Sequence, residues 1–282
     1  QRRRQDMALN SERSLMLVLL AAISVVGQPF DPANSSPIKI DNRIVSGSDA
    51  KLGQFPWQVI LKRDAWDDLL CGGSIISDTW VLTAAHCTNG LSSIFLMFGT
   101  VDLFNANALN MTSNNIIIHP DYNDKLNNDV SLIQLPEPLT FSANIQAIQL
   151  VGQYGDSIDY VGSVATIAGF GYTEDEYLDY SETLLYAQVE IIDNADCVAI
   201  YGKYVVVDST MCAKGFDGSD MSTCTGDSGG PLILYNKTIQ QWQQIGINSF
   251  VAEDQCTYRL PSGYARVSSF LGFIADKTGI AV

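Results

Sequence analysis

Short apolar or alternating segments, separated by turn residues, follow one another along the chain after residue 44. Such spacing is typical of an all-β barrel or sandwich rather than of repeated strand–helix units. A first series of strands is expected at Trp57–Leu61, Gly73–Ile76, Trp80–Ala84, Ile94–Phe98, Ile116–Ile118 and Val130–Leu135. A second series is expected at Val161–Ala168, Leu184–Ile191, Met211–Ala213, Pro231–Leu234, Gln243–Ser249 and Gly263–Val267. Only Ser268–Lys277 has the apolar face of a helix.

The first 43 residues follow a different pattern. Residues 1–6 hold three arginines ahead of Met7 and are interpreted as an upstream remnant. Residues 7–27 include the apolar run Leu15–Val26 and have the layout of a signal peptide, so secretion is expected. The run is short for a membrane span, and no membrane anchor is expected. Residues 28–43 are rich in Pro, Asn, Ser and Asp and predict a flexible leader.

Composition narrows the class of protein. The 282 residues are 46% hydrophobic, which is enough for a large core, and the formal net charge is −15. This charge argues against nucleic acid as a partner, because no basic surface can replace phosphate counterions. Six cysteines indicate three disulfides in an oxidising compartment, although 15 pairings are open. No ligand spacing indicates a metal, and no cofactor is expected.

The stretch Cys224–Pro231 has the composition of a loop that holds a nucleophile. Glycines on both sides of Ser228 let backbone N–H groups approach a reacting carbonyl, and the neighbouring Asp227 is an acid able to lock that backbone. The same composition is also typical of an ordinary turn between strands. The stretch is a nucleophile loop only if the chain also supplies a base and an orienting acid elsewhere.

Only two histidines can serve as the base. His119 precedes Pro120 in an expected turn and is interpreted as structural. His86 lies in Val81–Cys87, which is interpreted as a buried strand that ends beside a cysteine. The acid must hold the imidazole tautomer whose other nitrogen accepts the serine proton. Asp129, directly before an apolar strand, is the candidate, although a carboxylate there is often only solvated.

With His86, Asp129 and Ser228 in this order, the sequence resembles the chymotrypsin-like serine proteases of the trypsin family, nearest to chymotrypsin- and elastase-like members. The resemblance runs from Ile44 to the C-terminus. It implies a protease domain of two packed antiparallel Greek-key β-barrels, about 44–148 and about 149–282, with a short C-terminal helix. The segments that carry it are Ile44–Gly47, Thr83–Cys87, Asn128–Leu132 and Gly226–Pro231.

The resemblance implies a role for each residue. Ser228 attacks the carbonyl, His86 moves the proton and Asp129 orients the imidazole, while the N–H groups of Gly226 and Ser228 form the oxyanion hole. Cleavage after Arg43 frees the amino group of Ile44, which pairs with Asp227 and so activates a zymogen. The alternative is that Arg43–Ile44 is an ordinary junction between leader and strand. The implied disulfides are Cys71–Cys87, Cys197–Cys212 and Cys224–Cys256.

The specificity pocket is also implied by the resemblance. Its base is Ser222, which is neutral, so cleavage after Arg or Lys is not expected. The substrate backbone pairs with Ser249, Phe250 and Val251. Val251 favours small or medium aliphatic residues, and the alternative is a preference for aromatic residues or Leu. Ser262 takes the second wall position, or Gly263 if the register slips by one residue.

Partners follow from the same resemblance. We expect protein or peptide substrates, a trypsin-like activating protease, protein inhibitors and a monomer; the physiological role, digestive or regulatory, stays open. The rival interpretation is a non-catalytic homologue that acts as a binding module.

Acidic stretches at Asp64–Asp68 and Glu174–Asp179 fall, by the same resemblance, in loops on the leaving-group side. They could favour basic substrate residues there or simply be solvated. Sequons for glycosylation start at Asn34, Asn110 and Asn236.

Overall fold

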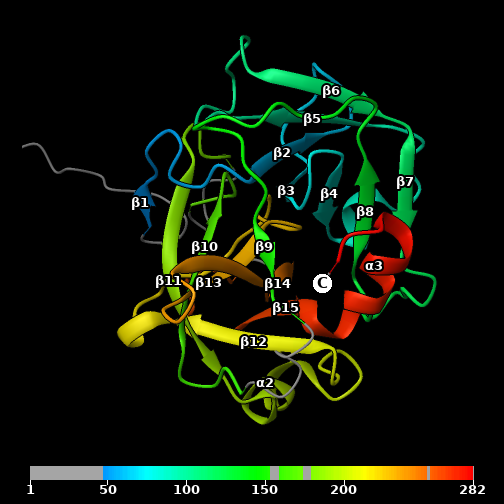
Figure 1. Cartoon of the computed structure of the whole chain (residues 1–282). Coiled ribbons are helices and arrows are strands. Elements are labelled where there is room, and N and C mark those ends of the chain that lie inside the picture. The colour runs from blue at the N-terminus through cyan, green and yellow to red at the C-terminus, as the bar shows by residue number, and fades with distance from the viewer. Residues whose placement is uncertain (1–46, 153–158, 174–178, 253–254, 282) are drawn as a thin grey trace, which may run out of the picture. The chain divides into compact units, whose positions relative to one another are not determined.

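The computed structural model describes residues 47–152, 159–173, 179–252 and 255–281, all within one compact unit that spans Asp41–Val282. The strands of this unit form two sheets (Figure 1). The predicted all-β architecture with a short C-terminal helix is confirmed. The signal peptide expected at 7–27, the leader at 28–43, the remnant at 1–6 and the junction at Ile44 lie outside the described residues.

The first sheet holds seven strands in the order β6-β5-β2-β3-β4-β8-β7, with every neighbouring pair antiparallel. All residues of β2, β3 and β4 are buried, so the middle of the sheet is covered on both faces. The strands are β2 (Gln58–Lys62), β3 (Cys71–Ile75), β4 (Trp80–Thr83), β5 (Ile94–Phe98), β6 (Leu109–Ser113), β7 (Asn115–Ile118) and β8 (Ser131–Gln134).

The second sheet is closed. A pairing between β11 and β12 joins the two ends of the path β11-β10-β13-β14-β15-β12 into a ring. Strand β1 adds to β11 although it precedes the first sheet in the chain, and β9 pairs with β14 in parallel. The strands are β1 (Ser48–Asp49), β9 (Gln149–Leu150), β10 (Val164–Gly169), β11 (Leu185–Ile192), β12 (Thr210–Gly215), β13 (Pro231–Asn236), β14 (Gln241–Phe250) and β15 (Ser262–Arg266).

Helices are few and short. The described helices are α1 (Ala85–Thr88), α2 (Asn194–Tyr201), α3 (Leu271–Thr278) and the 3-10 turns η2 (Phe216–Gly218) and η3 (Val267–Phe270). The expectation that only Ser268–Lys277 is helical is wrong, because α2 forms as well. In α2 only Cys197 is buried, and Asp193 caps the first turn by accepting the N–H of Ala195 at 2.7 Å. No described helix is long and apolar enough to cross a bilayer.

The two sheets share one core. A single hydrophobic cluster draws residues from strands of both sheets. A buried hydrogen bond also joins them: Ser74 Oγ on β3 donates to Gln244 Oε1 on β14 at 2.7 Å. The Nε2 of Gln244 donates in turn to the carbonyl of Gly246 at 3.0 Å. The sheets are therefore fixed against each other by apolar contact and by a satisfied polar pair.

Candidate active site

His86 lies in the one-turn helix α1, which follows β4 directly. The strand predicted to run to Cys87 in fact ends at Thr83. The disulfide between Cys71 and Cys87 holds this turn against the start of β3. The His86 side chain is 25% exposed, so its ring is anchored on one side and open to a ligand on the other.

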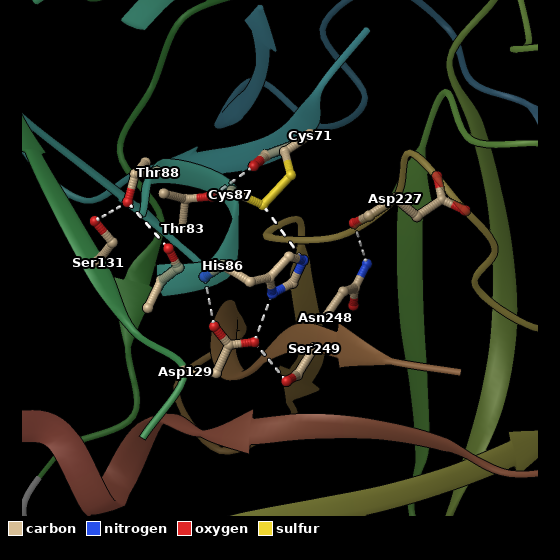
Figure 2. Close-up of a disulfide and its surroundings, with 12 residues drawn as sticks. Cys71, Thr83, His86, Cys87, Thr88, Asp129, Ser131, Asp227, Asn248 and Ser249 are labelled. Carbon is tan, nitrogen blue, oxygen red and sulfur yellow. Dashed lines mark hydrogen bonds and ion pairs between the residues drawn. A yellow bond between two sulfur atoms is a disulfide. The ribbon is translucent and has the colours of Figure 1, made fainter. Parts of the chain in front are cut away.

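Asp129 is completely buried, at 0% exposure, two residues before β8. Its Oδ2 accepts hydrogen bonds from His86 Nδ1 at 2.7 Å and from Ser249 Oγ at 2.6 Å (Figure 2). Its Oδ1 accepts the backbone N–H of His86 at 2.9 Å. With Nδ1 donating to Asp129, the lone pair of the neutral imidazole is on Nε2, the nitrogen that can take a proton from a nucleophile.

The turn before Asp129 places Asn128 in left-handed backbone. Asn128 has φ of 55°, and its Nδ2 donates to the carbonyl of Asp121 at 3.0 Å. Asparagine adopts this conformation at low cost because its short amide bonds locally. The following residue is thereby directed into the core beside α1.

Ser228 lies in the loop between β12 and β13, and the loop is bonded to both sheets. Its carbonyl accepts the N–H of Gly72 on β3 at 2.8 Å, and the N–H of Gly229 donates to Asn248 on β14, also at 2.8 Å. Gly229 has φ of 78°, and a Cβ there would collide with Thr83 Oγ1. Glycine is therefore required where the loop crosses β4.

The backbone N–H groups of Gly226 and Ser228 in this loop are open to a ligand. The N–H groups of Cys224, Asp227, Gly229 and Gly230 all have protein acceptors. No described residue accepts a hydrogen bond from the N–H of Gly226 or of Ser228. Gly226 has φ of 98°, and a Cβ there would lie 2.8 Å from Tyr180 Cε1. This backbone conformation is open only to glycine and leaves the two N–H groups available for an anionic oxygen.

His86 and Ser228 are not hydrogen-bonded to each other. Among the described residues no partner bonds Ser228 Oγ, and His86 Nε2 lies 3.7 Å from Cys87 Sγ. Proton transfer between the two requires hydrogen-bond reach of about 2.6–3.2 Å, which catalytic pairs often attain only with substrate bound.

Asp227 is a buried acid without a described cationic partner. Its Oδ1 accepts the N–H of Gly171 at 2.8 Å and its Oδ2 that of Cys224 at 2.9 Å. A Cβ on Gly169 or Gly171 would collide with the carboxylate, so both glycines make room for it. Burial raises the pKa of Asp227 to about 6, although the two N–H groups act to lower it.

A recess of about 160 Å³ opens beside Ser228. Of the predicted pocket residues, Ser249, Phe250 and Val251 line it. Ser222 and Ser262 are buried and are not among its lining residues. Ser222 Oγ donates to the carbonyl of Thr223 at 3.0 Å, and Ser262 Oγ shares a hydrogen bond of 2.8 Å with Tyr264 Oη. Gly263 pairs with Phe250, whose ring covers it.

The three disulfides have the pairing that the resemblance implied, and no described cysteine is free. The ligand atoms of Cys71, His86 and Cys87 lie within 4.8 Å of one another. Both sulfurs belong to the disulfide and offer no thiolate, so this group does not have the donors of a metal site.

Several contributors to the site were not predicted. Ser249 was expected only to bind substrate, yet its hydroxyl bonds Asp129. Asn248 Nδ2 donates to the carbonyl of Asp227 at 2.9 Å (Figure 2). The pair Gly169 and Gly171, which surrounds the Asp227 carboxylate, was visible in the sequence as two glycines closing a predicted strand. His119, interpreted as structural, packs its ring on Phe273 at 4.7 Å and joins the end of β7 to α3.

Comparisons with known proteins identify the family of this chain. The trypsin family model matches residues 44–274. The chain is 38% identical over 240 residues to brachyurin from Leptuca pugilator, covering 84% of this chain and 99% of that protein. It is 34% identical over 270 residues to a collagenase from Hypoderma lineatum, and the match covers 94% of this chain and 98% of that protein. A solved structure of HL collagenase matches with a TM-score of 0.74 at 33% identity, covering 84% of this chain and 100% of that chain. The chain belongs to the trypsin family of serine endopeptidases.

Proposed function

We propose that Ser228 is the nucleophile of this endopeptidase, with His86 as its general base and Asp129 as the group that orients His86. The observation that carries the proposal is the fully buried Asp129 carboxylate bonded to His86 Nδ1. It fixes the tautomer in which Nε2 is the acceptor. The unbonded N–H groups of Gly226 and Ser228 support an oxyanion hole at the same loop.

The chemistry is acyl transfer in two steps. Ser228 Oγ attacks the scissile carbonyl carbon while its proton passes to His86 Nε2, and the carbonyl oxygen becomes an anion that accepts the two N–H groups. The carbon–nitrogen bond then breaks, and His86 returns the proton to the leaving amine. Water attacks the acyl-enzyme with His86 again as base, which releases the acid and restores Ser228.

A fluorophosphonate probe tests the assignment. The activated enzyme should take up one equivalent of probe on Ser228, and Ser228→Ala should take up none and hydrolyse no peptide. His86→Ala should label at least 100-fold more slowly, because general base catalysis is lost. Absence of labelling in activated protein would favour the rival interpretation, a homologue that only binds.

The enzyme is made as a zymogen in this proposal. Cleavage after Arg43 frees an ammonium group on Ile44 that enters the site of Asp227. The support is the buried carboxylate itself, which is bonded to two N–H groups, has a raised pKa and has no cationic partner among the described residues. A buried charge without a partner is costly, so an arriving ammonium would favour the active loop. Arg43→Gln should prevent activation by trypsin.

The cleavage preference is for small or medium aliphatic residues. Val251 lines the recess beside Ser228, and no residue of that lining carries a charge for Arg or Lys. The buried Ser222 and Ser262 are neutral as well. The alternative is a preference for aromatic residues or Leu. A peptide library digested by the activated enzyme separates the two, and dominance of Arg or Lys at the cleaved position would exclude both. Because one relative is named collagenase, native collagen belongs in the substrate panel.

Secretion completes the proposal. Three disulfides are typical of proteins from oxidising compartments, and residues 7–27 have the layout of a signal peptide. Since the neutral pocket disfavours cleavage after Arg43, a trypsin-like protease would activate the chain. The protein is expected to act as a monomer on protein or peptide substrates and to meet protein inhibitors outside the cell.

A further inference from the structure

A groove of about 460 Å³ lies in the first sheet, between the tip of the β2–β3 hairpin and the segment from β5 to β6. We call it the hairpin groove. Its lining is mixed, and two of its aromatic side chains are open to solvent: Trp66 is 95% exposed and Phe104 is 61% exposed. Phe95 and Met97 of β5 line it as well. Its volume is in the range of sites that hold a small ligand or a few side chains.

Lys62 gives the hairpin groove an unusual charge. The residue lines the groove and is only 6% exposed, yet among the described residues its ammonium group has no hydrogen bond or ion pair. The nearest favourable contact is with the ring of Phe104, whose centroid is 5.6 Å from Nζ. Most of the residue is buried, and its ammonium group offers a cation without a protein counter-ion to an anion that enters the groove.

The nearby carboxylates do not supply that anion. Asp64 Oδ1 accepts the N–H groups of Trp66 and Asp67 at 2.8 and 3.0 Å and so shapes the turn. Asp67 pairs with Arg63 at 3.6 Å. Asp68 lines the groove without an ion pair to any described cation, Lys62 included. The ammonium group of Lys62 is thus a cation of the groove without a carboxylate partner among the described residues.

The hairpin groove begins close to the nucleophile loop. A Cβ on Gly226 would lie 3.0 Å from Leu69 Cδ2, and Leu69 directly follows Asp68. From Leu69 to Trp66 is three residues, a span of at most about 10 Å. An extended substrate covers this span with about three residues.

The leaving-group side of the substrate is the part that runs this way. In the proposed function, the residues before the scissile bond pair with Ser249–Val251 on β14. Ser228 lies between that segment and β3, because its carbonyl bonds Gly72 while the N–H of Gly229 bonds Asn248. The chain after the scissile bond therefore leaves on the side of β3 and its hairpin.

We propose that the hairpin groove binds the leaving-group side of the substrate, with an Asp or Glu carboxylate on Lys62 and a neighbouring aromatic or large aliphatic side chain against Trp66 and Phe104. The inference rests on the proposed function and names a feature of its substrate. It assigns selectivity to a site outside the recess beside Ser228. It also predicts a preference for acidic substrate residues on the leaving-group side, whereas the acidic stretch Asp64–Asp68 taken as a whole would favour basic ones.

Matched peptides test this proposal. All share one sequence up to two residues past the cleaved bond, and then carry Phe followed by Glu, Gln or Lys. For the wild-type enzyme, kcat/KM should be about 5-fold higher with Glu than with Gln and lowest with Lys, and the difference should shrink in high salt. Lys62→Met keeps the stem and removes the charge, so it should make Glu and Gln equal.

The control variant is Lys237→Met, which changes an exposed lysine in the β13–β14 turn and should keep the wild-type order. Trp66→Ala should lower kcat/KM about 5-fold for peptides with Phe and leave peptides with Gly there unchanged. A short anilide substrate, which does not reach the groove, should be cleaved equally by all variants. Failure of wild-type enzyme on that anilide and on every peptide would speak against the proposed function, not against the groove alone.

Three outcomes overturn the proposal itself: a wild-type preference for Lys, an unchanged ratio of Glu to Gln in Lys62→Met, or loss of anilide cleavage in that variant. Asn110, which begins a sequon, also lines the groove, and a glycan there would compete with substrate. The series is therefore measured before and after enzymatic removal of N-glycans. A preference that appears only after removal would overturn the proposal for the native protein.

Discussion

Asp129 is held by donors that are distant in the chain. His86 donates to its carboxylate twice, and Ser249, 120 residues away, donates once. The sequence could predict the identity of the acid because it stands before an apolar strand in a recognisable segment. It could not predict the Ser249 bond, since nothing local to either residue encodes a contact between the two sheets.

Replacing Asp129 with Asn should abolish the orientation of His86. The amide cannot accept the Nδ1 proton as a carboxylate does, so kcat on a short substrate should fall by about 10²- to 10⁴-fold. Ser249→Ala leaves the bond between Asp129 and His86 in place and should cost less than 10-fold. Equal losses in the two variants would contradict the assignment of roles.

Asp227 should make the uncleaved chain sensitive to pH. Its pKa rises from 3.8 to about 6 on folding, so between these values the folded chain keeps a proton that the unfolded chain has lost. The free energy of unfolding therefore falls as pH rises through this window, by up to about 3 kcal/mol. Urea titrations of Arg43→Gln protein from pH 4 to 7 measure the fall.

The matched control is the same protein with Asp227→Asn, in which the free energy of unfolding should not show this fall with pH. Trypsin-cleaved protein should not show the fall either, because the Ile44 ammonium would lower the pKa of the Asp227 carboxyl. If the two uncleaved proteins show the same pH dependence, Asp227 does not titrate in this window.

At the scale of elements, strands with apolar faces were predictable and elements without them were not. Every expected strand overlaps an observed one, and Ile94–Phe98 matches β5 at both ends. Strand β6 was missed because only Ser113 in it is buried. Helix α2 was missed because its apolar residues do not share one face; a cap and the Cys197–Cys212 disulfide stabilise it instead.

The disulfide beside α1 should matter for both stability and rate. Removing it by Cys71→Ser with Cys87→Ser frees a loop of 16 residues, for which chain entropy gives a loss of about 3 kcal/mol. A helix of one turn is not stable alone, so the placement of His86 should loosen and kcat should fall. Removal of the Cys197–Cys212 disulfide, which has a separation of 15 residues, is the control. It should lower stability by a similar amount and leave kcat unchanged. Equal effects on kcat would show that α1 is held without its disulfide.

At the scale of the whole molecule, the contact between the sheets combines apolar burial with few polar bonds. Ser74→Ala would leave Gln244 Oε1 buried without its donor, at a cost of about 1–3 kcal/mol in the free energy of unfolding. Ser142→Ala, at an exposed position, should change stability by less than about 0.5 kcal/mol. Chemical denaturation of both variants measures the difference, and a neutral Ser74→Ala would mean that water replaces the hydroxyl.

The general architecture was predictable because four short segments identify the family, but the arrangement at the sheet contact was not. Ser222 and Ser262 illustrate the limit. Their positions in the chain imply a pocket, yet both are buried outside the lining of the recess beside Ser228, and their hydroxyls bond near neighbours in the chain, Thr223 and Tyr264.

The loop that holds Ser228 is bonded to β3 on one side and to β14 on the other. Neither sheet alone can position it, so in a nascent or partly refolded chain the proposed nucleophile is not yet in place. During biosynthesis this would protect the chain, and the unfolded proteins around it, from premature digestion, independently of any cleavage at Arg43. Recovery of hydrolysis by refolding, already cleaved enzyme should accordingly follow the last kinetic phase, in which the two sheets come together.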